Sequence, residues 1–202
     1  MAGAPTFSTR DPLAPRFWDE RFEQGFTPWD RAGVPQQLQA YARSQPRPLT
    51  TLIPGCGAAY EAVFLLEQGW DVAAIDFSPQ AVQAARAQAG KWADRIVQAD
   101  FFAYEPAAPL DLIYERAFLC ALPRSMWQQV AARWADLLAP GALLAGYFYE
   151  GDTVKGPPFG AAPREIAALL AGAFALECDD PVTDSIAVFA GKERWQCWRR
   201  LP

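Results

Sequence analysis

Two glycines and an aspartate in the first half of the chain have the spacing of a nucleoside-binding site. Gly55 and Gly57 follow an apolar run at 49–53 that is suited to a strand buried on both faces, and a helical pattern follows the turn. Asp76 ends a second apolar segment (70–75), about 20 residues beyond the turn, where a carboxylate can accept hydrogen bonds from both ribose hydroxyls. The combination predicts a strand, a glycine turn and a helix that together hold a nucleoside.

The same residues have simpler interpretations. A Gly-x-Gly turn can serve the backbone alone, and Asp76 could cap the helix that begins near Ser78 and Pro79. Ser78 is itself a good N-cap residue, with Pro79 in the first helical turn. The ribose-binding interpretation of Asp76 is therefore favoured.

The residues after the turn indicate the kind of nucleoside. A dinucleotide fingerprint has a third glycine three residues after the second, but Tyr60 stands at this position and Glu61 follows it. A carboxylate at the start of the helix would repel a diphosphate bound at that N-terminus. A phosphate-free cofactor with a cationic or zwitterionic tail, such as S-adenosylmethionine, fits better. An NAD-dependent oxidoreductase would use the same turn and acid, and is the alternative.

Strands and helices alternate between residues 49 and 149, which predicts a parallel, doubly wound α/β sheet. Ligands of such sheets bind beyond the carboxyl ends of the strands. Gly55, Asp76, Asp100 and Arg116 are all expected at those ends. The expected strands are 49–53, 70–76, 95–99, 110–114 and 142–149, followed by an antiparallel pair at 174–178 and 194–201.

Composition limits the class of protein. The 202 residues, 51% hydrophobic and 20% charged, predict a single globular domain. A net charge of −5 argues against nucleic acid as the main partner, because phosphate binding needs a basic surface. No apolar run is long enough for a membrane span, and residues 1–15 lack the apolar core of a signal peptide. We expect a soluble, cytoplasmic protein whose first 15 residues are mobile.

The chain has four cysteines and no histidine. Without histidine it lacks the commonest metal ligand and the commonest general base, which argues strongly against a zinc enzyme or a Ser-His-Asp hydrolase, and we expect no metal site. The cysteines show no metal-ligand spacing and are expected to be core residues in a reducing compartment. A disulfide between Cys178 and Cys197, on neighbouring terminal strands, is the alternative.

Four motifs follow one another along the chain: Phe17–Phe22 with Gly25–Asp30, Ile53–Glu61, Tyr114–Pro123 and Gly156–Phe159. In this order they resemble the thiopurine S-methyltransferase family, which includes bacterial members and plant halide/thiol methyltransferases. The resemblance runs from residue 16 to residue 171. It implies a class I methyltransferase fold: a three-layer α/β/α domain with a Rossmann-like, doubly wound sheet of seven strands, mostly parallel with an antiparallel C-terminal strand. It also implies a single domain at 16–202 with an N-terminal helical and aromatic lid at 16–45.

The resemblance also implies a reaction and a set of site residues. The methyl donor would be S-adenosylmethionine, and the acceptor a small soft nucleophile such as a thiol, a thiopurine, a halide or a selenium or tellurium compound. The protein would act as a monomer. Arg116, Asp30 and Trp29 are the expected catalytic residues. The expected cofactor-binding residues are Trp18, Trp29, Gly55, Cys56, Gly57, Asp76, Phe77, Asp100, Phe101 and Arg116.

These roles have structural alternatives. The aromatic residues of the lid could simply pack on the core, Arg116 could form a salt bridge at a strand end, and Asp30 could cap a loop. A catalytically silent protein that binds the cofactor would keep the same motifs. A nucleic-acid N-methyltransferase is disfavoured, because no Asn/Asp-Pro-Pro-Tyr sequence follows the fourth strand.

The chain departs from the family pattern at several positions. Ala59 stands where the bacterial pattern has a second glycine, and Glu115 replaces the usual aspartate before the arginine. The segment from Leu176 onward matches poorly, so no acceptor contacts are carried over to it.

Overall fold

The computed structural model describes residues 5–151, 153 and 155–202. Its strands form one seven-stranded sheet in the order β3-β2-β1-β4-β5-β7-β6. The first five strands pair in parallel, and β7 runs antiparallel between β5 and β6. The mostly parallel sheet with a reversed C-terminal strand is therefore confirmed. The strands are β1 Thr50–Pro54, β2 Asp71–Asp76, β3 Ile96–Gln98, β4 Leu110–Arg116, β5 Leu138–Tyr149, β6 Phe174–Pro181 and β7 Glu193–Arg200.

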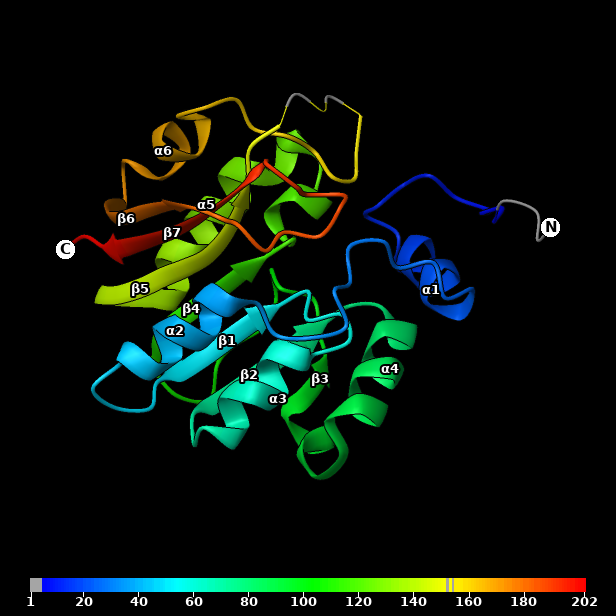
Figure 1. Ribbon diagram of the computed structural model, residues 1–202, viewed down its shortest axis with the longest axis horizontal. Coiled ribbons are helices and arrows are strands. Elements are labelled where there is room, and N and C mark those ends of the chain that lie inside the picture. The colour runs from blue at the N-terminus through cyan, green and yellow to red at the C-terminus, as the bar shows by residue number, and fades with distance from the viewer. Residues whose placement is uncertain (1–4, 152, 154) are drawn as a thin grey trace.

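Helices cover both faces of the sheet, which gives the expected three layers (Figure 1). Three helices bury residues in one hydrophobic core: α2 Gln36–Ser44, α3 Tyr60–Glu67 and α4 Pro79–Ala89. Two others, α5 Trp127–Leu137 and α6 Glu165–Leu170, bury residues in the core on the opposite face.

The central strands are apolar because both of their faces are buried. In β1, Leu52 belongs to one core and its neighbour Ile53 to the other. β4 alternates in the same way, with Leu112 in one core and Ile113 in the other. Side chains of a strand point alternately to opposite faces, so a short continuous apolar run fills both layers.

The largest difference from the expected strand bounds is at the start of β5. Leu110 pairs with Leu138 but Leu112 pairs with Leu143, so residues 139–142 form a bulge that contains Pro140. β5 therefore begins at Leu138 rather than at residue 142, since a proline is tolerated at a bulge. A 3-10 turn, Arg124–Met126, leads into α5, which begins at Trp127.

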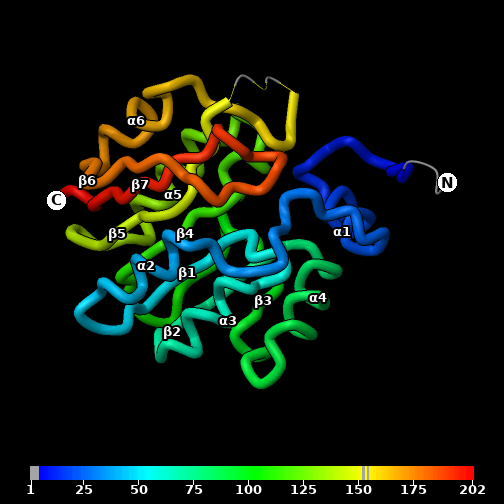
Figure 2. The backbone as a smooth tube through the Cα atoms, viewed as in Figure 1, coloured from blue at the N-terminus to red at the C-terminus, as the bar shows by residue number. Residues whose placement is uncertain are grey.

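Helix α1 (Pro15–Glu23) lies off the carboxyl ends of the central strands, as the backbone trace shows (Figure 2). Asp19 attaches it to the start of α4: one carboxylate oxygen accepts hydrogen bonds from the hydroxyl of Ser78 (2.6 Å) and the backbone N–H of Gln80 (3.2 Å). The indole of Trp18 donates to the carbonyl of Pro12 (2.8 Å), so part of the segment before α1 packs against the helix. Residues 1–4 of the expected mobile segment lie outside the described residues.

Cys178 of β6 and Cys197 of β7 are register partners on adjacent strands, and both are free thiols.

Within the described part of the chain, no helix has the length and apolarity needed to cross a membrane.

Candidate functional site

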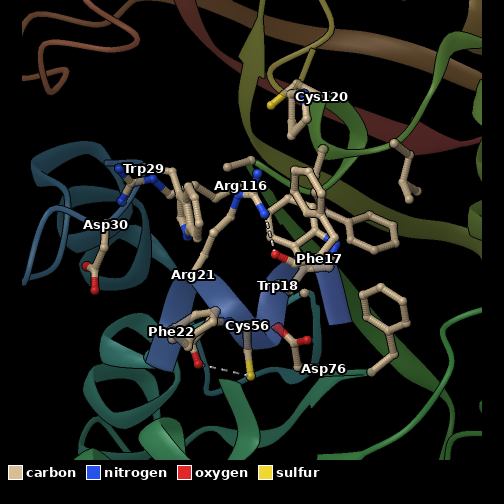
Figure 3. A pocket seen from close by; sticks show the side chains of 18 of the residues that line it. Phe17, Trp18, Arg21, Phe22, Trp29, Asp30, Cys56, Asp76, Arg116 and Cys120 are labelled. Atoms are coloured by element: carbon tan, nitrogen blue, oxygen red, sulfur yellow. Dashed lines mark hydrogen bonds between the residues drawn. The ribbon is translucent and has the colours of Figure 1, made fainter. Parts of the chain in front are cut away.

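A cavity of about 930 Å³ lies where β1, β2 and β4 end, beneath α1 and the loop that follows it (Figure 3). The volume is at the upper end of the range of about 300–1,000 Å³ that is typical of small-molecule sites. Every site residue that the sequence predicted lines this one cavity. They are Trp18, Trp29, Asp30, Gly55, Cys56, Gly57, Asp76, Phe77, Asp100, Phe101 and Arg116.

The glycine turn after β1 forms the floor of the cavity. Gly55 has a φ of +60°, and a Cβ at this position would lie 2.8 Å from Cδ2 of Phe118. Gly57 also has a positive φ, of +52°. The backbone N–H of Cys56 donates to the carbonyl of Ile75 (3.0 Å), which joins the turn to the end of β2. The turn thus needs glycine for its conformation and exposes main chain to the cavity.

Asp76 ends β2 with its side chain turned toward the glycine turn. It is 8% exposed; its Oδ2 accepts from the N–H of Gly57 (3.2 Å) and its Oδ1 from that of Ser78 (3.0 Å). Burial raises the pKa of this carboxyl to about 6, although these backbone hydrogen bonds act in the opposite direction. Ser78 caps α4 by accepting from the N–H of Ala81 (3.1 Å). The helix has its own cap, so Asp76 is not needed for that purpose.

Aromatic side chains form the wall beyond β2 and β3. The ring centroid of Phe101 lies 4.9 Å from that of Phe118, in an edge-to-face arrangement, and 5.3 Å from that of Phe102. Asp100 is exposed, and its Oδ1 accepts from the N–H of Phe102 (2.9 Å). With Phe77, these residues make an apolar slot with a carboxylate at its rim, which suits a flat heterocycle.

Three aromatic residues of the predicted lid meet over the cavity. Trp29 packs edge to face against Trp18 (centroids 5.3 Å apart) and against Phe22 (6.1 Å). All three line the cavity and are half-buried (Figure 3). The tip of Phe22 lies 3.8 Å from where a Cβ of Gly57 would stand, so the cluster reaches the glycine turn. The cluster therefore packs on the rest of the protein and also covers the cavity.

Arg116, at the end of β4, pairs with Glu61, in the first turn of α3. The distance between Nη1 and Oε1 is 2.8 Å, and the side chains are 9% and 15% exposed. Burial alone would lower the pKa of Arg116, but the nearby charge of Glu61 acts against it and the pKa is raised. The salt bridge that was the structural alternative for Arg116 is present, and both of its partners line the cavity.

Asp30 forms the predicted loop cap, since its Oδ1 accepts from the backbone N–H of Ala32 (2.7 Å). It also lines the cavity. Its place in the loop leaves it at the lid side of the cavity, away from the floor formed by the glycine turn.

The cavity also contains residues that the sequence did not single out. Phe7 and Arg10 come from the segment before α1, Phe118 and Cys120 from the chain after β4, and Phe189 from the link between β6 and β7. Phe118 belongs to the motif at 114–123, so an aromatic residue within a motif was the feature of the sequence that could have identified it as a site residue. Nothing in the local sequence around Phe7 or Phe189 indicates that these residues reach the site.

Comparison with known proteins agrees with this arrangement. A sequence profile of the thiopurine S-methyltransferase family matches residues 13–200. A probable thiol methyltransferase 2 of Arabidopsis thaliana is 31% identical over 164 residues, covering 76% of this chain and 70% of that protein. A thiopurine S-methyltransferase of Pseudomonas fluorescens is 30% identical over 184 residues, covering 81% and 83%.

A solved structure shares the fold. The 1,6-didemethyltoxoflavin-N1-methyltransferase of Burkholderia thailandensis, with bound S-adenosylhomocysteine, superimposes with a TM-score of 0.75 at 19% identity, covering 100% of this chain and 94% of that one. The profile match extends over nearly the whole length of the domain, from the aromatic lid to the last strand. The chain therefore belongs to the thiopurine S-methyltransferase family and is an S-adenosylmethionine-dependent methyltransferase.

Proposed function

We propose that the protein methylates a small soft nucleophile, namely a thiol, a thiopurine, a halide or a selenium or tellurium compound. The observation that carries this proposal is the convergence of the glycine turn, Asp76, Arg116 and the aromatic lid on one cavity. Relatives named as thiol, thiocyanate and thiopurine methyltransferases support the same acceptor class.

The floor of the cavity suits the methyl donor. A glycine turn gives the amino-acid end of the donor access to main-chain groups, and Asp76 can accept from the ribose hydroxyls. Glu61 lies in the first turn of α3, so the start of this helix carries a carboxylate where a phosphate-binding site would need none. These features fit a cofactor without phosphate and with a cationic centre.

Each site residue then has a role. Gly55, Cys56 and Gly57 would hold the amino-acid end of the donor, and Asp76 would hold its ribose. Arg116 would bind the donor carboxylate or the acceptor. Phe77, Asp100 and Phe101 would hold the adenine. Trp18 and Trp29 would cover the donor and the acceptor, and Asp30 would lie beside the acceptor.

The donor supplies a methyl group on a positively charged sulfur. The protein has to align this group with the acceptor in line and to exclude water, which is a large part of catalysis for such a displacement. Trp18, Phe22 and Trp29 can do both, and their ring faces attract a cation by about 1–2 kcal/mol. Soft nucleophiles with a low pKa require no strong general base, which suits a chain without histidine.

We further propose that the enzyme acts as a monomer in the cytoplasm on a small-molecule acceptor, not on nucleic acid. The net charge of −5 supports the last point, because nucleic-acid binding depends on positive charge.

The test has two steps. Calorimetry with S-adenosylhomocysteine should detect binding, and titration with NADH should detect none. A radiolabelled-methyl assay over small thiols, thiopurines, halides and selenium compounds should then identify the acceptor. Binding of the cofactor product without methylation of any member of this panel would contradict the proposed activity and indicate a silent binding protein.

A further inference from the structure

Four arginines line the cavity, and they differ in whether a carboxylate neutralises them. Arg31 pairs with Asp184 (2.9 Å) and Arg116 with Glu61 (2.8 Å). Among residues 5–151, 153 and 155–202, no carboxylate oxygen lies within 4.0 Å of the guanidinium of Arg21 or of Arg10. Arg10 is exposed, whereas Arg21 is half-buried. Arg21 therefore has no ion-pair partner among these residues and is partly shielded from water, although the charge of the neighbouring Glu20 acts on it.

The guanidinium of Arg21 is held in one place. Its carbon lies 3.3 Å from the ring centroid of Phe17 and 4.0 Å from that of Phe7, so the group is stacked against two aromatic rings. One terminal nitrogen donates to the backbone carbonyl of Phe17. Figure 3 shows the side chain reaching from α1 toward the cavity. A guanidinium has five N–H donors in a planar fork, so donors remain for a ligand in the cavity.

The balance of charge indicates what that ligand is. The arginines and carboxylates that line the cavity are equal in number: four arginines face four carboxylates, Asp30, Glu61, Asp76 and Asp100. A donor with a sulfonium and a zwitterionic amino-acid end adds one positive charge. Arg31 and Arg116 are already paired with Asp184 and Glu61, so Arg21 is the partly shielded arginine of the lining that has no ion-pair partner in the described part of the chain. A charge in a site of low polarity is stabilised by a group of opposite charge, so an anionic group of the acceptor is the ligand that suits Arg21.

Arg21 lies apart from the residues proposed to hold the amino-acid end and the ribose of the donor. The donor-binding groups, Gly55, Gly57 and Asp76, form the floor at the strand ends, whereas Arg21 belongs to α1 and the lid. Stacking on Phe7 and Phe17 fixes the plane of the guanidinium, and this plane sets the direction of its remaining N–H groups. We propose that Arg21 binds an anionic group of the methyl acceptor, such as a carboxylate, distinct from the nucleophilic sulfur. This assignment rests on the proposed function and narrows its substrate class.

The experiment compares two thiols that differ by one carboxylate, thiophenol and 4-mercaptobenzoate. The wild-type enzyme should use 4-mercaptobenzoate more efficiently. Arg21→Gln keeps a donor for the Phe17 carbonyl but removes the charge. It should lower kcat/KM for 4-mercaptobenzoate by roughly 10- to 100-fold, mainly through KM, and change kcat/KM for thiophenol by less than about threefold. Arg21→Lys keeps the charge without the planar fork, so its kcat/KM for 4-mercaptobenzoate should lie between those of the wild type and Arg21→Gln.

Arg43→Gln is the matched control, because Arg43 is exposed on α2 and is not among the residues that line the cavity. It should leave both thiols unaffected, and the affinity of Arg21→Gln for S-adenosylhomocysteine should equal that of the wild type. Equal losses for both thiols in Arg21→Gln would overturn the assignment, since they indicate a structural role. A matching loss of S-adenosylhomocysteine affinity would overturn it too, because the guanidinium would then serve the donor carboxylate. Methylation of neither thiol by the wild type would overturn the assignment of Arg21, whereas the proposed function fails only if no member of the whole acceptor panel is methylated.

Discussion

The guanidinium of Arg116 donates to the carboxylate of Glu61 over 2.8 Å, across 55 positions of sequence, at the edge of the cavity. The pair joins the end of β4 to the first turn of α3 and so fixes the orientation of both elements beside the glycine turn. Glu61 satisfies only part of the hydrogen-bonding capacity of Arg116. The guanidinium keeps further donors for a carboxylate of the donor or an anionic acceptor.

Replacing Arg116 should reduce turnover more than stability. Arg116→Ala is expected to lower kcat/KM by roughly 10- to 100-fold, the effect of losing a charge-assisted hydrogen bond in a shielded site. Stability should also fall, because Glu61 is left buried without its partner. The double variant Arg116→Met/Glu61→Met removes both charges and should recover most of the melting temperature without recovering activity. Recovery of both together would show that the pair is purely structural.

Trp29 should matter for activity through its aromatic face. Trp29→Ala removes the ring that packs against Trp18 and Phe22, opens the cavity to water and removes a cation–π contact of about 1–2 kcal/mol. We expect kcat/KM to fall about tenfold or more, with a small change in melting temperature, because the residue is only half-buried. Trp29→Phe is the control and should keep most of the activity. Equal losses of melting temperature and activity in Trp29→Ala would contradict this role.

Local spacing was enough to predict the floor of the site. The turn at Gly55 and Gly57 and the acid at Asp76 are fixed by one strand–turn–helix unit and the strand that follows it, so their relation depends on short-range structure. The antiparallel ending of the sheet was equally accessible, because the link before the last strand has turn signals and no clear helix.

The rest of the site depends on contacts between distant segments. The pairing of Arg116 with Glu61 requires the start of α3 to lie near the end of β4, which no local pattern encodes. Phe7 and Phe189 reach the cavity from irregular segments, whose paths periodicity cannot predict. The bulge in β5 was missed because a Pro-Gly pair signals a turn equally well as an irregularity within a strand.

Cofactor affinity should depend on pH through Asp76. Burial raises the pKa of its carboxyl to about 6 in the free protein. Ribose hydroxyls donate to the ionised carboxylate, so binding favours the charged form and must displace a proton when the pH is below that value. Calorimetry from pH 5 to pH 8 should therefore show S-adenosylhomocysteine affinity rising with pH and levelling above about pH 7. Asp76→Asn should bind more weakly with little pH dependence between these limits; a wild-type slope in this variant would assign the titration to another group.

Glu115 should make the free energy of unfolding depend on pH. This residue is 1% exposed beneath the site, where its carboxylate accepts from the backbone N–H groups of Phe118 (3.2 Å) and Leu119 (3.2 Å). Burial raises the pKa of this carboxyl to about 8, although the two N–H groups act in the opposite direction. The folded pKa lies above the value of about 4.3 expected for an unfolded chain, so the folded state holds more protons between these two values.

Because the folded state binds more protons than the unfolded state, the free energy of unfolding falls as the pH rises. The contribution of Glu115 is fully present below about pH 4.3, and it is lost as the pH rises toward 8, by up to about 1.4 kcal/mol per pH unit. Urea unfolding of the wild type and of Glu115→Gln at pH 5.5, 6.5 and 7.5 measures it, because all other titrating groups are common to both proteins. The stability of the wild type relative to Glu115→Gln should decrease across this series. Parallel pH profiles would mean that Glu115 has the same protonation state in the folded and unfolded chain.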